Sequence, residues 1–213
     1  MINLYFMQYD LTGKGFSGES CGSDYDLSEA CPVCGTRAKL IDNLRSKGIN
    51  KVNKEIFATM DGDDIISQKL YEILKEKGIK VGNLIQVTNT KNELLPFYHL
   101  KSNFYLPKMS SKTRGIIIDE EMQCKLCKQD SYFGTVKENP FVFYKEFFYN
   151  YLKESSIFCT WEHFGLSNLK EEGMKVIRYA RPHLIVTEKF KNSIEELGLK
   201  YVIFNPVIVE NVV

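Results

Sequence analysis

Two Cys-x-x-Cys pairs are the residues of this chain whose type and spacing point most directly to chemistry. The pairs are Cys31/Cys34 and Cys124/Cys127. A two-residue spacer lets both thiolates of a pair face one metal ion from a single tight turn, and two such turns supply the four sulfur ligands that tetrahedral Zn²⁺ prefers. Gly35 directly after the first pair suits this turn, because glycine readily takes a positive φ. We therefore predict one structural zinc ion shared by the two pairs.

Other uses of the cysteines stay open at the level of sequence. The pairs could form two separate sites, could have lost their metal, could act as a redox dithiol with the thioredoxin spacing, or could be ordinary core cysteines. Cys159 and His163 form a Cys-x3-His pair that offers either an alternative pair of ligands or a catalytic dyad. Cys21, in a Gly/Ser-rich segment shortly before Cys31, is interpreted as a spare thiol.

Motifs that would define an enzyme are absent from the sequence. It contains no phosphate-binding loop, nucleophile elbow or H-E-x-x-H motif. Gly13, Gly15 and Gly18 match the spacing of a dinucleotide-binding loop, but residues 19–23 do not begin an apolar-periodic helix. Four thiolates would also close a metal site to substrate. We therefore expect a protein that is not an enzyme.

The composition is that of a globular protein and argues against charged macromolecular partners. The 213 residues are 44% hydrophobic and 26% charged, and 28 Lys and Arg against 27 Asp and Glu leave a net charge of +1. Such a chain has no bulk attraction to nucleic acid or to an anionic membrane, so we expect neither as a partner. No apolar run is long enough to cross a bilayer, and the first residues lack the features of a secretory leader. We expect a cytoplasmic protein with reduced thiols.

A strand–helix–strand unit is predicted in the first half of the chain. Residues 64–66 have the apolar character of a short strand, and Ser67 is a suitable helix cap. Apolar residues then recur at helical spacing until Gly78, a typical residue just beyond a helix end. Residues 84–87 form the predicted second strand.

The same order recurs near the C-terminus. Residues 184–186 predict a strand, Thr187 a helix cap, Gly198 the helix end, and residues 201–207 the following strand. The matching caps and glycines lead us to interpret the chain as two degenerate halves with one shared core. We place their boundary so that the halves cover 1–110 and 111–213. The predicted fold class is α+β, with two related strand–helix–strand halves around mixed or antiparallel sheet, joined by the pair of zinc knuckles.

Candidate residues for contact with a partner come from two short segments. Asp61, Asp63 and Asp64 form an acidic run that could hold a metal, face a basic partner or simply form a turn. Trp161 is the only tryptophan and is followed by Glu162. Because aromatic anchors and matched charges dominate protein interfaces, we mark these five residues as candidates for partner binding.

The two cysteine motifs and the C-terminal unit together carry a family resemblance. They read Cys31-Pro32-Val33-Cys34-Gly35, Cys124-Lys125-Leu126-Cys127-Lys128, Pro182-His183-Leu184-Ile185-Val186-Thr187-Glu188-Lys189-Phe190, Gly198-Leu199-Lys200 and Phe204-Asn205-Pro206-Val207. This resembles the double-CXXCG bacterial immunity proteins found beside polymorphic toxins, although Lys128 stands where the family has its second glycine. The resemblance implies a cytoplasmic, non-catalytic protein that binds and neutralises a cognate protein toxin. The alternative is a zinc-ribbon-like nucleic-acid-binding or regulatory protein, which would call for a basic surface.

Overall fold

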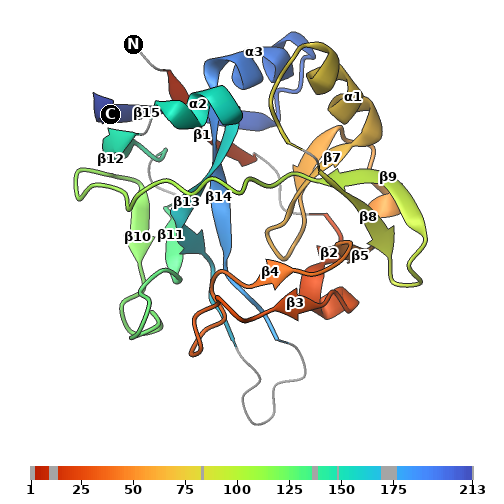
Figure 1. Ribbon diagram of the computed structural model, residues 1–213, viewed down its shortest axis with the longest axis horizontal. Coiled ribbons are helices and arrows are strands. Elements are labelled where there is room, and N and C mark those ends of the chain that lie inside the picture. Colours follow the sequence, from red (N-terminus) through yellow and green to blue (C-terminus); the bar gives the residue numbers. More distant parts are fainter. Residues whose placement is uncertain are drawn as a thin grey trace.

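Strands form most of the regular structure of this protein. A computed structural model describes residues 3–9, 14–82, 84–135, 139–147, 149–168 and 177–212. Within these ranges the strands make a seven-stranded sheet, a six-stranded sheet and a two-stranded ribbon, accompanied by a few short helices (Figure 1). The predicted mixed α+β class is confirmed at this level.

The seven-stranded sheet has the order β10-β11-β13-β14-β1-β15-β12. Its strands are β1 (Leu4–Tyr9), β10 (Ile116–Ile118), β11 (Tyr132–Gly134), β12 (Val142–Phe147), β13 (Ile157–Phe164), β14 (Arg181–Thr187) and β15 (Val202–Val212). β1 runs antiparallel to both of its neighbours, β14 and β15, whereas β12 is parallel to β15 and β11 to β13. The first strand of the chain thus lies inside a sheet built mainly from later residues. The predicted halves 1–110 and 111–213 share this sheet, and the division itself stays a prediction.

The six-stranded sheet has the order β2-β5-β8-β9-β7-β6. Its strands are β2 (Phe16–Ser17), β5 (Arg45–Lys47), β6 (Ile56–Ala58), β7 (Asp64–Ser67), β8 (Ile85–Asn89) and β9 (Leu94–His99). The β5–β8 pair is parallel and the other pairs are antiparallel. A separate ribbon of β3 (Tyr25–Asp26) and β4 (Lys39–Leu40) and the 3-10 helices η1 (Gly18–Cys21) and η2 (Ile49–Lys51) complete this part of the molecule.

Two helices occur where the sequence predicts them, each between two strands. α1 (Gln68–Glu76) follows β7 and α3 (Glu188–Glu196) follows β14, while the short α2 (Asn150–Glu154) lies between β12 and β13. Ser67 Oγ accepts a hydrogen bond from Leu70 N at 3.0 Å, and Thr187 Oγ1 accepts one from Phe190 N at 3.4 Å. These bonds satisfy backbone N–H groups that a helix start leaves unpaired. The strand–helix–strand order is therefore observed in both segments, and their relation as degenerate copies stays a prediction.

The apolar faces of α1 and α3 meet in one core cluster. Leu70 and Leu74 from α1 pack with Phe190 and Ile194 from α3, and strand residues of both sheets, among them Met7, complete the cluster. The two helices lie next to each other in Figure 1, and an ion pair between Lys77 and Glu196 joins their C-terminal ends. In the ranges that the structure describes, no helix is both long and apolar enough to cross a membrane.

The caps provide the first prediction. Ser67→Ala and Thr187→Ala should each lower the free energy of unfolding by about 1 kcal/mol, because each removes the acceptor for one backbone N–H at a helix start. Urea denaturation measures the change. Ser111→Ala, at an exposed position away from both helices, serves as the control and should leave the midpoint unchanged. A midpoint shift in the control as large as those of the cap variants would contradict the capping role.

Candidate metal centre

The structure brings the two Cys-x-x-Cys pairs together. The sulfur atoms of Cys31, Cys34, Cys124 and Cys127 all lie within 4.8 Å of one another. Cys31 Sγ is 3.8 Å from Cys124 Sγ, and Cys34 Sγ is 3.4 Å from Cys127 Sγ. Four sulfurs on a regular tetrahedron at the usual Zn–S distance are about 3.8 Å apart, so this cluster fits a four-thiolate metal site. The prediction that both pairs face one site is confirmed, and zinc as the metal stays a prediction.

Each pair lies in its own backbone turn, and the two turns have the same hydrogen-bond pattern. Gly35 N donates to Cys31 O at 2.8 Å, and Lys128 N donates to Cys124 O at 3.1 Å. Gly35 has φ 70° and Lys128 has φ 55°, so the lysine takes the left-handed conformation that glycine takes in the first turn. The absence of glycine therefore does not prevent the second turn. It imposes instead the steric cost of a side chain at positive φ.

The surroundings of the sulfurs shift the pKa values of the cysteine thiols in different directions. Burial raises the pKa of the Cys31 thiol, but the backbone N–H groups of Cys34 and Val33 outweigh it, and the net pKa is lowered. Burial raises the pKa of Cys127 to about 11 and raises that of Cys34 as well. Thiolate ligands must lose their protons to bind a metal, so metal binding here would release protons.

The other two cysteines lie outside the cluster. Cys159 is buried in β13, where its thiol donates to Ser102 O at 3.4 Å, and Cys21 is buried beside Ser20. Neither Cys159 nor His163 belongs to the metal cluster found among the described residues. Burial also raises the pKa of Cys159 to about 12 and lowers that of His163 to about 4. Both shifts disfavour the thiolate–imidazolium pair that a catalytic dyad would use.

The acidic run turns its second and third carboxylates inward. Asp63 and Asp64 are buried, with Asp64 accepting from Tyr9 Oη at 2.8 Å, whereas Asp61 is half-buried and accepts from Ser17 N at 2.9 Å. Burial raises the pKa of Asp64 to about 7. Of the three predicted contact residues in this run, Asp61 is the one with substantial exposure, and its role in partner binding stays a prediction.

Trp161 and Glu162 have different surroundings. Glu162 is 1% exposed, its Oε1 accepts from Met109 N at 2.7 Å, and burial raises its pKa to about 7. Trp161 is half-buried, and Lys108 Nζ lies 5.3 Å from the centre of its ring. Trp161 is thus partly exposed, whereas the Glu162 carboxylate is used inside the protein, and partner binding by either residue stays a prediction.

Arg181 is the ion-pair partner of Asp63, and the sequence alone did not predict this contact. Arg181 Nε donates to Asp63 Oδ1 at 2.7 Å, and Nη2 donates to Glu19 Oε2 at 2.8 Å. Burial alone would raise the pKa of Asp63, but the charges of Arg181 and His99 and the hydrogen bonds from Arg181 and Ser17 together outweigh it, and the pKa is lowered. The only sequence signal for this role is a charged residue at the start of an apolar strand.

Comparison with protein-family models, with curated proteins and with solved structures gave no match.

The cysteine cluster predicts that the protein binds a metal ion and that its free energy of unfolding depends on that ion. Elemental analysis of the purified protein should find one zinc ion per chain. Cys31→Ser should lower the metal content and reduce the free energy of unfolding by several kcal/mol, because metal binding to a folded site contributes directly to folding. Cys21→Ser is the matched control, since it changes a buried cysteine outside the cluster. Unchanged metal content and melting temperature in Cys31→Ser would rule out a structural metal at these residues.

The two turns predict stability changes of opposite sign. Gly35→Ala should destabilise the metal-loaded protein by about 1 kcal/mol, because alanine is strained at φ 70°. Lys128→Gly should raise the stability by a smaller amount, because the relief of strain is partly offset by the greater entropy of the unfolded chain. Chemical denaturation of both variants measures the difference. Destabilisation by both would show that Lys128 is not strained.

Proposed function

We propose that this chain is an immunity-type protein that binds and neutralises a cognate bacterial protein toxin, with a structural zinc ion held by Cys31, Cys34, Cys124 and Cys127. The observation that most directly supports this is the convergence of the four thiols, since the two motifs that carry the resemblance to double-CXXCG immunity proteins form one cluster. Four thiolates would leave no coordination position for a substrate. The zinc ion would instead give rigidity to a binding surface.

The exposed side chains of the two turns suggest where a toxin would bind. Val33 is 57% exposed and Leu126 is 62% exposed, and each directly precedes the second cysteine of its pair. Since the sulfurs of Cys34 and Cys127 are 3.4 Å apart, both apolar residues lie next to the same cysteine cluster. Met122, near the second pair, is 59% exposed. Exposed apolar groups gathered in one region are typical of protein-binding surfaces.

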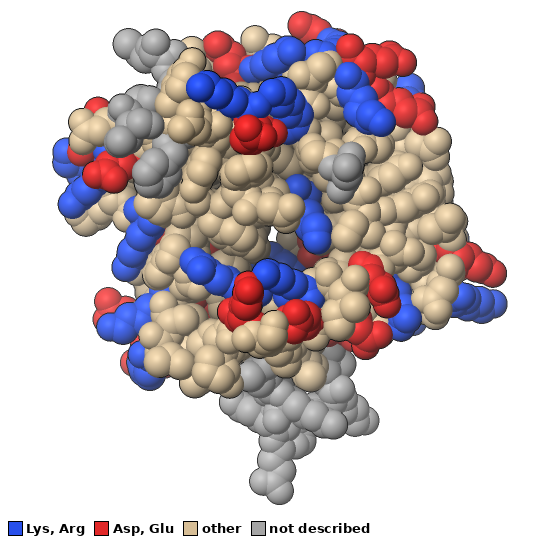
Figure 2. Space-filling view, in the orientation of Figure 1, with Lys and Arg blue, Asp and Glu red and all other residues tan. Residues whose placement is uncertain are grey.

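The distribution of charge agrees better with a protein partner than with nucleic acid. Figure 2 shows Lys and Arg side chains interspersed with Asp and Glu side chains over the face that it presents. The chain as a whole carries a net charge of +1. Binding to nucleic acid relies on Lys and Arg gathered into a basic surface, so interspersed charges weigh against the zinc-ribbon alternative.

A capture and rescue experiment tests the proposal. The tagged full chain is used to isolate partners from its native host, and the captured protein is identified and expressed alone in a second bacterial host. We expect growth arrest by the captured protein, restored growth when this chain is co-expressed, and a one-to-one complex of the purified proteins. Capture of nucleic acid, or of a protein whose expression does not arrest growth, would contradict the proposal.

Charge substitutions at the turns locate the binding surface. The double variant Val33→Glu, Leu126→Glu should lose the ability to restore growth, because it places charges in an apolar contact that must lose water on binding. Its metal content should stay at the wild-type level. Leu94→Glu is the matched control, since Leu94 is 63% exposed and lies on β9 of the six-stranded sheet. Normal rescue by the double variant would place the toxin on another surface.

A further inference from the structure

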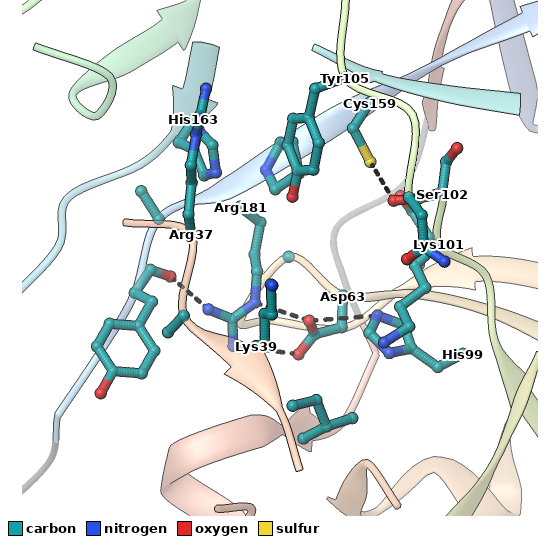
Figure 3. Close-up of a pocket in the computed structure, with 18 of the residues that line it drawn as sticks. Arg37, Lys39, Asp63, His99, Lys101, Ser102, Tyr105, Cys159, His163 and Arg181 are labelled. Atoms are coloured by element: carbon teal, nitrogen blue, oxygen red, sulfur yellow. Dashed lines mark hydrogen bonds and ion pairs between the residues drawn. The ribbon is translucent and has the colours of Figure 1, made fainter. Parts of the chain in front are cut away.

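A large cavity lies between segments of the two sheets and reaches the residues that follow the first cysteine turn. Its volume is about 740 Å³, within the range of small-molecule sites. The walls come from β13 and β14 of one sheet, from β7 and the segment after β9 of the other, and from the β3–β4 ribbon (Figure 3). We propose that this cavity binds a small organic oxyanion, a phosphate or a carboxylate, through Arg37 and Lys101. The cavity borders the first cysteine turn, but this inference does not depend on toxin binding.

The deepest cation of the cavity is already neutralised. Arg181 donates to Asp63 and Glu19, and further to Tyr179 O at 2.9 Å. At the rim, Lys39 is paired with Glu29. Neither Arg181 nor Lys39 therefore needs a ligand to balance its charge.

Arg37 and Lys101 differ from these two cations. Among the described residues, neither forms an ion pair with a carboxylate. The Arg37 side chain is exposed, and its guanidinium lies over the ring of Tyr105, 5.6 Å from its centre, without a hydrogen-bond acceptor among the described residues. Lys101 is half-buried, which lowers the pKa of its ammonium group. Both side chains line the same cavity. They supply two positive charges and several unused hydrogen-bond donors.

The carboxylates that line the cavity cannot satisfy these donors from their present positions. Asp63 accepts from Arg181 and from Ser17 Oγ at 2.6 Å, Asp64 accepts from Tyr9, and Glu29 pairs with Lys39. In the described part of the chain, none of these carboxylates forms an ion pair with Arg37 or Lys101. A ligand that fits must bring acceptor atoms and negative charge, which phosphate and carboxylate groups do.

His99 provides a second observation in favour of a ligand, because one of its ring nitrogens lacks a hydrogen-bond partner among the described residues. His99 lines the cavity, and its Nε2 lies 3.6 Å from Asp63 Oδ1. Its Nδ1 is buried and has no hydrogen-bond partner among the described residues. Buried polar atoms are nearly always paired, so an unpaired one beside a cavity favours a bound ligand or water there.

The first cysteine turn places Arg37 at this cavity. Arg37 follows Cys34 by three positions, has φ 71°, and is succeeded by Ala38, whose N donates to Gly35 O at 2.9 Å. A non-glycine residue at positive φ is held there by its surroundings, and such strain is often found at binding sites. The turn that carries two of the metal ligands therefore also orients one of the two free cations.

Calorimetric titration of the metal-loaded full chain tests the proposal with three probes. Adenosine 5′-monophosphate and citrate carry phosphate and carboxylate groups, and adenosine is the uncharged control. We expect at least one of the two anions to bind at a single site, with an affinity that falls as salt is added, and no binding of adenosine. Binding of the monophosphate alone would identify phosphate as the ligand group, and binding of citrate alone would identify carboxylate. Failure of both anions to bind, or equal binding of adenosine, would overturn the proposal.

Two substitutions assign the binding to the cavity. Arg37→Gln and Lys101→Gln should each weaken binding of the anion by about tenfold or more, the usual effect of losing a charge-assisted hydrogen bond. Lys112→Gln removes an exposed cation outside the cavity and should leave the affinity unchanged. Unaltered melting temperatures and metal content show that the variants are folded. Undiminished affinity in both cavity variants would overturn the proposal, whereas the growth assay reports separately on toxin binding.

Discussion

The buried guanidinium of Arg181 is the contact on which the relation of the two sheets depends. Its side chain is 13% exposed, and it joins β14 of one sheet to Asp63, just before β7 of the other, and to Glu19 in η1. A charge in this position is tolerated only with well-placed partners, since loss of either partner leaves an unpaired buried charge. The network thus joins the two sheets by a buried polar contact at the wall of the cavity, beside the apolar cluster that both sheets share.

Local elements were predictable from the sequence because their signals are local. The caps Ser67 and Thr187 and the apolar spacing after them lie within a few residues of the helices they define. The insertion of β1 between β14 and β15 has no comparable signal, because strand pairing between distant segments depends on the whole set of available edges. The fold class was therefore within reach of sequence reasoning, and the strand order was not.

The candidate sites likewise divide into features with a local sequence signal and features that depend on contacts between distant residues. The residue type and spacing of the four cysteines predict a metal site. If one tetrahedral metal ion is assumed, the two pairs are expected to lie close together, as they do. Asp63 resembles a surface turn residue in sequence because its partner, Arg181, comes 118 positions later. Arg37 and Lys101 are ordinary surface cations by sequence. Their significance arises from missing partners, which are visible only when the surroundings of each side chain are known.

The distance along the chain between the two cysteine turns has a consequence for biosynthesis. Cys31 and Cys124 are 93 positions apart, so the ribosome needs roughly 5–20 s to deliver the second turn after the first. During this interval the first pair of thiols has left the exit tunnel without the other two ligands. Coordination of a metal by all four cysteines therefore becomes possible only once residue 127 has been translated, after α1 and before most of the seven-stranded sheet. A metal ion at this site would thus link two distant segments while β12, β13, β14 and β15 of the seven-stranded sheet are still to be added.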